Sequence, residues 1–171
     1  MQFENVENAT SKGDKKKALA LYVALYKDPT TDEEAKKNAA YNIATLFHEL
    51  GDTHRSYGWS KRALSHMTSK NVKKFQGSFL VIANDLFNHQ KIAESVDLYS
   101  SVLDKLCKER SSNKAVFLKN AVVVALANDN ESKARDVLDS AYRCNISTAK
   151  LDEMELEFLN YEVEKKSWTS A

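Results

Sequence analysis

The sequence repeats itself four times at a nearly constant interval. A small apolar residue marks the same place in each unit, at Val6, Ala44, Ala83 and Val122. These positions are separated by 38, 39 and 39 residues. A second small residue follows twelve positions later in each unit, as Ala18, Ser56, Ser95 and Ala134. Periods of roughly twenty to fifty residues are typical of solenoids, because one unit is too small to bury its own apolar face and packs on its neighbour.

Within each unit the apolar residues have the spacing of two helices joined by a short turn. In the second unit they occupy positions i, i+3, i+4 and i+7, as Ala40, Ile43, Ala44 and Phe47, and so share one helical face. Thr31 followed by Glu34 predicts a capping box at the start of this helix. Gly51 can end it in the left-handed conformation, and Asp52 or Thr53 can cap the next helix.

We therefore expect a single all-α domain over residues 1–171 with nine helices. The predicted repeats cover approximately 1–29, 31–69, 70–110 and 112–144, and a closing helix covers 148–168. The predicted fold class is an α-solenoid, a right-handed superhelix of stacked antiparallel helical hairpins. Glu155 takes the close-packing position in the closing helix, where a charge would be hard to bury. We expect this helix to end the array with its many carboxylates in water.

The pattern resembles the tetratricopeptide repeat over about residues 3–142. The chain departs from that signature at Ala44, Ala83 and Val122, where the family prefers glycine, and only Pro29 matches the closing proline. Its units are also longer than the family's 34 residues. The resemblance implies a non-enzymatic protein–protein interaction module that holds a peptide or helix of another protein in a concave groove.

The resemblance places the binding site on the inner face of the opening helices, opposite their packing residues. The predicted site residues are Tyr41, Asn42, Thr45, Asn84, Phe87, Lys119 and Asn120. An asparagine side chain both donates and accepts hydrogen bonds, so it can hold the backbone of an extended peptide. The same asparagines could instead pack between units or be solvated. The apolar residues expected beside them require cover, by a partner segment or by the closing helix folded back: Leu80, Val81, Phe87, Val123 and Leu126.

A secondary candidate is the basic stretch between Thr53 and Lys74. It contains six cations and no acid, namely Arg55, Lys61, Arg62, Lys70, Lys73 and Lys74. These residues could form a solvated helix back and linker, or a dock for an acidic partner or nucleic acid. Nucleic acid is not favoured, because the stretch lacks interleaved exposed aromatic residues and the whole chain has a net charge of only +1.

No catalytic residue, cofactor or metal site is expected. His48 and His54 flank a segment that resembles a zinc-protease helix, but Asp52 stands where the motif needs histidine. Cys107 and Cys144 are too far apart in sequence to suggest a disulfide framework, so they are expected to be core or boundary residues in a reducing compartment. The start of the chain lacks a signal-peptide pattern and no apolar run is long enough for a membrane helix. We therefore expect a cytoplasmic protein that does not contact membranes.

Two further functions remain open at this point. The chain could be a chaperone or regulator of the tetratricopeptide type that sequesters a partner protein. It could also be a structural subunit that self-associates through its terminal units, so a homo-oligomer is one of the open states. Salt-insensitive peptide binding would favour the interaction module, whereas a concentration-dependent mass would favour self-association.

Overall fold

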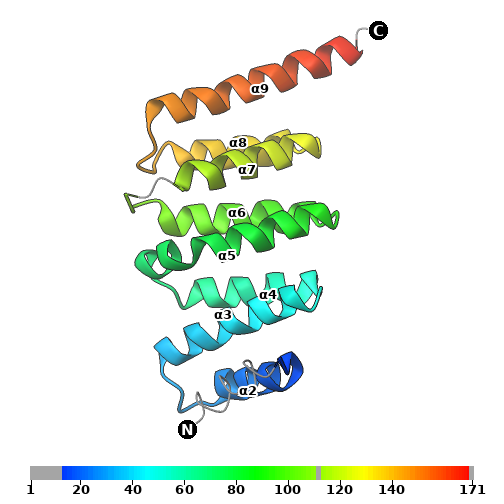
Figure 1. Cartoon of the computed structure of the whole chain (residues 1–171). Coiled ribbons are helices and arrows are strands. Elements are labelled where there is room, and N and C mark those ends of the chain that lie inside the picture. The colour runs from blue at the N-terminus through cyan, green and yellow to red at the C-terminus, as the bar shows by residue number, and fades with distance from the viewer. Residues whose placement is uncertain (1–12, 111–112, 170–171) are drawn as a thin grey trace.

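The computed structural model describes residues 13–110 and 113–169, with side chains placed as far as residue 165. These described residues form eight helices and no strand (Figure 1). The helices are α2 (Lys15–Lys27), α3 (Glu33–Glu49), α4 (Thr53–Ser65), α5 (Ser69–Asn88), α6 (Ile92–Leu106), α7 (Lys114–Ala127), α8 (Glu131–Ala141) and α9 (Thr148–Thr169). The predicted opening helix of the first repeat, with Val6, lies outside the described residues.

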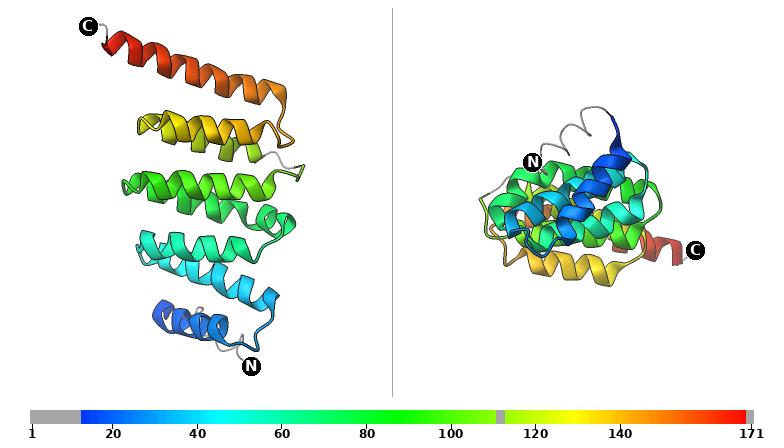
Figure 2. Two further views of the ribbon diagram at one scale, coloured as in Figure 1. Left: turned by 180° about the vertical axis from the view of Figure 1, so that it is seen from behind. Right: turned by 90° about the horizontal axis from the view of Figure 1, so that it is seen from below.

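The helices stack in chain order, with α2 at one end and α9 at the other (Figure 1). Helices α3, α5 and α7 lie on one side of the stack, and α4, α6 and α8 lie on the other (Figures 1 and 2). Contacts join consecutive helices and also helices two apart, such as α4 with α6 and α7 with α9. The predicted all-α class is confirmed for the described part of the chain.

One backbone position recurs two residues before each even-numbered helix. Gly13, Gly51, Gln90 and Asp129 have positive φ angles of 71°, 77°, 62° and 54°. They are separated by 38, 39 and 39 residues, which are the intervals predicted from the side chains. A left-handed residue ends one helix and lets the chain reverse into the next. The sequence repeat is therefore also a repeat of backbone geometry.

Side-chain caps define where several helices begin. Asp52 accepts a hydrogen bond from the Arg55 backbone N–H at the start of α4, as expected. The expected capping box at Thr31 is wrong by one residue, because Asp32 caps α3. The Thr31 hydroxyl instead donates to the Leu25 carbonyl oxygen at 2.8 Å, which ties the loop to the end of α2.

The repeated small residues lie where paired helices cross. Ala44, Ala83 and Val122 are fully buried, as predicted. The Ser56 hydroxyl donates to the carbonyl oxygen of Ala44 at 2.9 Å, and the Ser95 hydroxyl donates to that of Ala83 at 2.8 Å. A buried hydroxyl in this place is small enough for close helix contact and satisfies its own hydrogen-bonding requirement. Residues twelve positions apart in the sequence are therefore in contact where the two helices cross.

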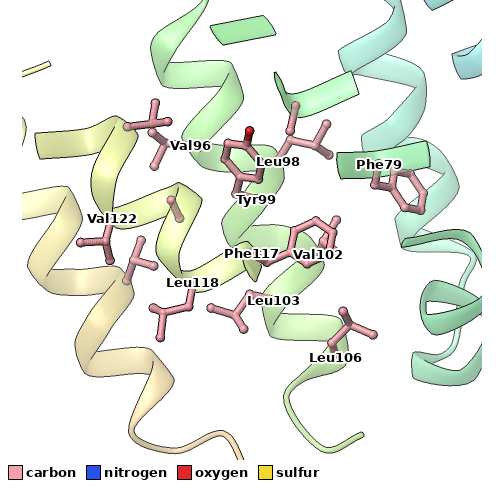
Figure 3. Packing of buried hydrophobic residues seen from close by; sticks show 14 of the residues in the cluster. Phe79, Val96, Leu98, Tyr99, Val102, Leu103, Leu106, Phe117, Leu118 and Val122 are labelled. Atoms are coloured by element: carbon pink, nitrogen blue, oxygen red, sulfur yellow. The ribbon is translucent and has the colours of Figure 1, made fainter. Parts of the chain in front are cut away.

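The larger apolar core extends from α3 to α9, with many of its residues on α6 and α7. Figure 3 shows Tyr99 and Leu103 of α6 beside Phe117 and Leu118 of α7. The Tyr99 and Phe117 rings meet edge to face, with their centres 6.3 Å apart. A smaller cluster joins α2 to α3. Each helix pair therefore buries its apolar side chains against the next pair rather than around one centre.

Polar side chains also connect neighbouring pairs. Three hydrogen bonds between them join residues 40 apart in the sequence: Tyr26 with His66, Tyr57 with Asp97 and Lys61 with Ser101. The offset is close to the repeat length. Successive pairs are therefore stacked in the same register.

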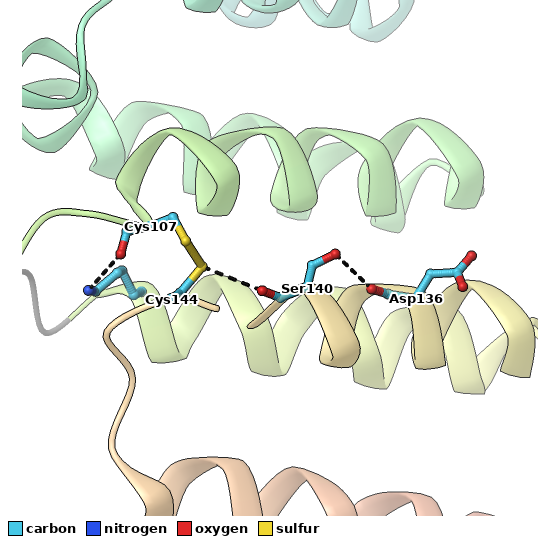
Figure 4. The surroundings of a disulfide bond; sticks show 5 residues. Cys107, Asp136, Ser140 and Cys144 are labelled. Atoms are coloured by element: carbon cyan, nitrogen blue, oxygen red, sulfur yellow. Dashed lines mark hydrogen bonds between the residues drawn. A yellow bond between two sulfur atoms is a disulfide. The ribbon is translucent and has the colours of Figure 1, made fainter. Parts of the chain in front are cut away.

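Cys107 and Cys144 form a disulfide bond, so the expectation of two unpaired cysteines is wrong (Figure 4). Cys107 ends α6 and Cys144 follows α8, with their Cα atoms 4.5 Å apart. Their sequence separation of 37 is close to one repeat, so the stacking brings them together. Disulfides persist mainly in oxidising environments. The cysteines consequently give no support to the expected cytoplasmic location.

Helix α9 ends the described stack by packing on α7 and α8. The alternative in which it folds back over the predicted site is wrong, because Phe87 and Val123 remain 39% and 38% exposed. Glu155 is not simply solvated: the Arg135 guanidinium donates to both of its carboxylate oxygens at 3.1 Å, and the Tyr142 hydroxyl donates at 2.9 Å. A half-exposed carboxylate with these partners can occupy the packing position that a lone charge could not.

Candidate partner-binding surface

Helix α5 presents one continuous exposed face. Exposed positions recur every three or four residues along it, as Lys70, Lys74, Gly77, Val81, Asn84 and Asn88. This spacing places them on one side of the helix, opposite the buried Val72, Phe79 and Leu86. The exposed Lys73 and Phe87 border the same side. We call these eight residues the α5 face.

Apolar side chains interrupt this otherwise polar surface. Val81 and Phe87 of the α5 face are 52% and 39% exposed. On α7, the next odd-numbered helix, Val116 and Val123 are 41% and 38% exposed. The other two expected groove residues, Leu80 and Leu126, are half-buried and buried, so they belong to the packing between helices. Single exposed apolar residues are ordinary, but several on adjacent elements indicate a contact site.

The three predicted asparagines differ in what their amides do. Asn84 is exposed, and its Oδ1 accepts a hydrogen bond from the Tyr99 hydroxyl, which leaves the amide donors for another group. Asn42 is half-buried and donates to the Asn38 carbonyl oxygen of its own helix at 2.9 Å. Asn120 is half-buried on α7. Only Asn84 is both exposed and oriented by a neighbour.

Tyr41 helps to join α3 to α5, and Thr45 bonds within α3 itself. The Tyr41 ring centre is 4.4 Å from that of Phe75, and its hydroxyl shares a 2.6 Å hydrogen bond with Ser78 of α5. The Thr45 hydroxyl donates to the Asn42 carbonyl oxygen at 2.9 Å. These contacts engage the Tyr41 and Thr45 hydroxyl groups that would otherwise be available to hydrogen-bond a bound peptide. The candidate surface is therefore narrower than predicted and is centred on α5 and α7.

Lys119 remains half exposed but already has an anionic neighbour. Its Nζ lies 3.5 Å from a carboxylate oxygen of Glu153 on α9. Between α7 and α9, beside this ion pair, is a cavity of about 180 Å³ that Val116 also lines. Lys119 is on the surface, but its charge is partly balanced by Glu153 of α9.

The fold divides the predicted basic stretch between the two sides of the stack. Lys70, Lys73 and Lys74 begin the α5 face, although the basic stretch was predicted to be a site separate from Asn84 and Phe87. The helical spacing of exposed positions from Lys70 to Asn88 is the sequence signal that places these residues on one face. The other three cations belong to α4: Arg55 bonds to Asp52 at 2.6 Å, and the Arg62 guanidinium lies 4.7 Å above the Trp59 ring.

Lys61, the third cation of α4, belongs to a polar network around Asp97. The Tyr57 hydroxyl donates to the Asp97 carboxylate at 2.6 Å, and Lys61 Nζ lies 2.9 Å from it. Burial raises the pKa of Asp97, but the hydrogen bonds from Tyr57 and Lys61 and the lysine charge outweigh it, so this pKa is below its ordinary value. Burial and, to a smaller extent, the hydrogen bond to Asp97 raise the pKa of Tyr57. A cavity of about 430 Å³ lies beside Lys61, between α4 and α6.

Within residues 13–110 and 113–169, no three His, Cys, Asp or Glu side chains are placed to share a metal ion. His48 and His54 each lie beside a different carboxylate, 3.3 Å from Asp85 and 3.5 Å from Glu94. No helix in this part of the chain has both the length and the apolar character needed to cross a membrane. A scan against protein-family models and a search of curated proteins both found no match to the chain.

Proposed function

We propose that the chain is a tetratricopeptide-like solenoid that binds an apolar segment of another protein along α5 and α7. The observation that carries this proposal is the exposure of Val81 and Phe87 on α5 together with Val116 and Val123 on α7. Covering such groups releases water from apolar surface and favours association. The recurring left-handed position and three hydrogen bonds between neighbouring pairs at an offset of 40 residues support the repeat architecture.

The polar groups around these exposed apolar residues suggest the chemistry of the bound segment. Lys70, Lys73 and Lys74 lie at the N-terminal end of the α5 face, and Asn84 and Asn88 lie towards its other end. A segment that combines apolar side chains with carboxylates near the lysines matches this order. Exposed ion pairs are worth only about 0–1 kcal/mol, so a ligand carboxylate can replace Glu153 beside Lys119.

The test is affinity capture with the full chain as bait, followed by quantitative mass spectrometry. We expect a specific partner to be retained by the wild-type protein and reduced about tenfold with a V81Q/V123Q double variant, because the lost contacts are apolar. Leu50→Gln, at an exposed apolar residue at the end of α3 and outside this surface, is the matched control. Equal capture by wild-type and double variant would exclude this surface as the binding site.

A peptide from the captured partner then allows single contacts to be measured by calorimetry. Phe87→Ala should weaken binding by about 2 kcal/mol if the ring is an anchor. Asn84→Ala should cost about 1 kcal/mol for a lost hydrogen bond. Phe87→Ala should alter the melting temperature little, because the ring is exposed, whereas Asn84→Ala should lower it because the buried Tyr99 hydroxyl loses its acceptor.

A further inference from the structure

Helix α9 has an apolar stripe on the side that faces away from the stack. Leu156, Leu159 and Val163 are 57%, 56% and 67% exposed, more than any other large apolar residue in the described chain. Their spacing of i, i+3 and i+7 places them on one side of the helix. The opposite side is buried against α7 and α8 through Leu151, Met154 and Phe158. The expectation that α9 forms a polar end is therefore wrong for its outward side.

The inner side of α9 shows what kind of surface recognises this helix. Its apolar residues are bordered by carboxylates that meet cations from the preceding helices. Glu153 lies 3.5 Å from Lys119 of α7, and Glu155 lies 3.1 Å from Arg135 of α8. The Arg135 guanidinium also lies 4.1 Å above the Phe158 ring. The inner contact is thus an apolar centre flanked by cation–carboxylate pairs.

The outer side has the same apolar centre and further carboxylates. Asp152 is exposed beside Leu156, and Glu162 is partly exposed at the border of the stripe. Neither of these two carboxylates forms an ion pair with another described residue. Over residues 148–169 the sequence has six acidic residues and three lysines. Two copies of α9 packed together would bring like charges into contact, which disfavours self-association through this face.

We propose that the outer face of α9, formed by Asp152, Leu156, Leu159, Glu162 and Val163, binds a basic amphipathic helix of a partner protein. The apolar side chains of that helix cover the stripe, and its lysines or arginines pair with the bordering carboxylates. The bound helix adds the next layer to the stack in the way that α9 itself is added. This face is separate from the α5 face, so the proposal does not depend on the proposed function.

Fluorescence anisotropy with synthetic helical peptides tests this proposal on the full chain. The probe is a labelled amphipathic peptide with a leucine stripe between lysines, and its matched control replaces the lysines with glutamates. We expect the lysine peptide to bind at least about tenfold more tightly than the glutamate peptide. An L156Q/V163Q double variant should weaken binding of the lysine peptide by about tenfold, whereas Leu50→Gln, at an exposed apolar residue outside both surfaces, should leave its affinity unchanged.

A charge variant tests the second part of the recognition. D152K/E162K should weaken the lysine peptide and reduce the dependence of its affinity on salt, because two opposing charges become like charges. All changed side chains are exposed or half-buried, and circular dichroism checks that each variant is folded.

Three results would overturn the proposal. Equal affinity for the lysine and glutamate peptides would exclude charge recognition. Unchanged affinity of the L156Q/V163Q variant would exclude the apolar stripe as the site. A concentration-dependent mass in sedimentation that this double variant abolishes would assign the face to a second copy of the chain. If capture through the α5 face fails but peptide binding at α9 succeeds, only the proposed function is rejected.

Discussion

Ala83 illustrates how a single side chain sets the distance between two helices. It is fully buried, and its carbonyl oxygen accepts the Ser95 hydroxyl from the paired helix at 2.8 Å. Ala44 and Ser56 form the same arrangement one repeat earlier. A larger residue at either position would separate the helices and break this bond. The small residues are therefore part of the crossing itself, and they do not simply fill space.

Ala83→Leu should lower the free energy of unfolding by about 1–3 kcal/mol, because the added atoms overpack the crossing. Urea denaturation followed by circular dichroism measures the loss. Ala93→Leu is the matched control, since Ala93 is exposed on α6 and the same change should be nearly neutral there. Equal stability of the Ala83 variant and wild type would contradict the assigned crossing.

Tyr57→Phe should raise the pKa of Asp97, because it removes a hydrogen bond that favours the ionised carboxyl. A carboxyl group whose pKa is held below its ordinary value adds stability at higher pH, and that stability is lost as the pH falls through the folded-state pKa. The variant should therefore lose less stability on acidification than wild type. Carboxyl-carbon NMR titration measures the pKa directly. Tyr142→Phe, which removes a bond to Glu155 instead, should leave the Asp97 titration unchanged.

Among the helices and turns, the repeated left-handed position shows that one geometry can be built from different residues. Gly13 and Gly51 adopt positive φ without steric cost, whereas Gln90 and Asp129 adopt it as non-glycine residues. The helices on both sides hold these residues in place through packing and caps. The turn is thus imposed by the repeat, and glycine only makes it easier.

Gln90→Gly should stabilise the protein by up to about 1 kcal/mol, because it removes left-handed strain but adds entropy to the unfolded chain. Gly51→Ala is the reverse test and should destabilise by about 1 kcal/mol. An added Cβ at Gly51 meets nothing within 4 Å, so this loss would report backbone conformation alone. Thermal denaturation of both variants is the measurement, and a destabilised Q90G protein would contradict the argument.

For the whole molecule, the disulfide is the one covalent cross-link, besides the backbone, between helix pairs in the described chain. It joins the end of α6 to the segment after α8, from which the chain enters α9. The Asn145 backbone N–H reinforces the link by donating to the Cys107 carbonyl oxygen at 3.2 Å. The last helix pair is therefore attached to the stack both by packing and by a bond that depends on redox conditions.

Removing this bond with C107S/C144S should lower the free energy of unfolding by as much as about 4 kcal/mol, the chain-entropy value for a loop of this length. Urea denaturation with and without reductant measures the effect. The double variant is its own control, because reductant should not change its stability. Two titratable thiols in the native protein without reductant would show that the bond does not form.

Local sequence patterns are sufficient to specify the structure within each unit. The helices, their reversal at Gly51 and the burial of Ala44 and Ala83 all follow from residues that lie within one helical hairpin. Asn84 and Phe87 are exposed on α5 as predicted, because helical periodicity alone separates the packed side from the open side.

Which side chains remain available on the surface and which are paired depends on how the helices pack together. Tyr41 packs on Phe75 and hydrogen-bonds with Ser78, and Cys107 is bonded to Cys144. The outward stripe of α9, in contrast, is left exposed by the described helices. The physical reason is that these neighbours lie about one repeat away in the sequence, beyond the reach of any local pattern. Stacking brings residues some 40 positions apart into contact, and the register of that stacking is a property of the packed molecule.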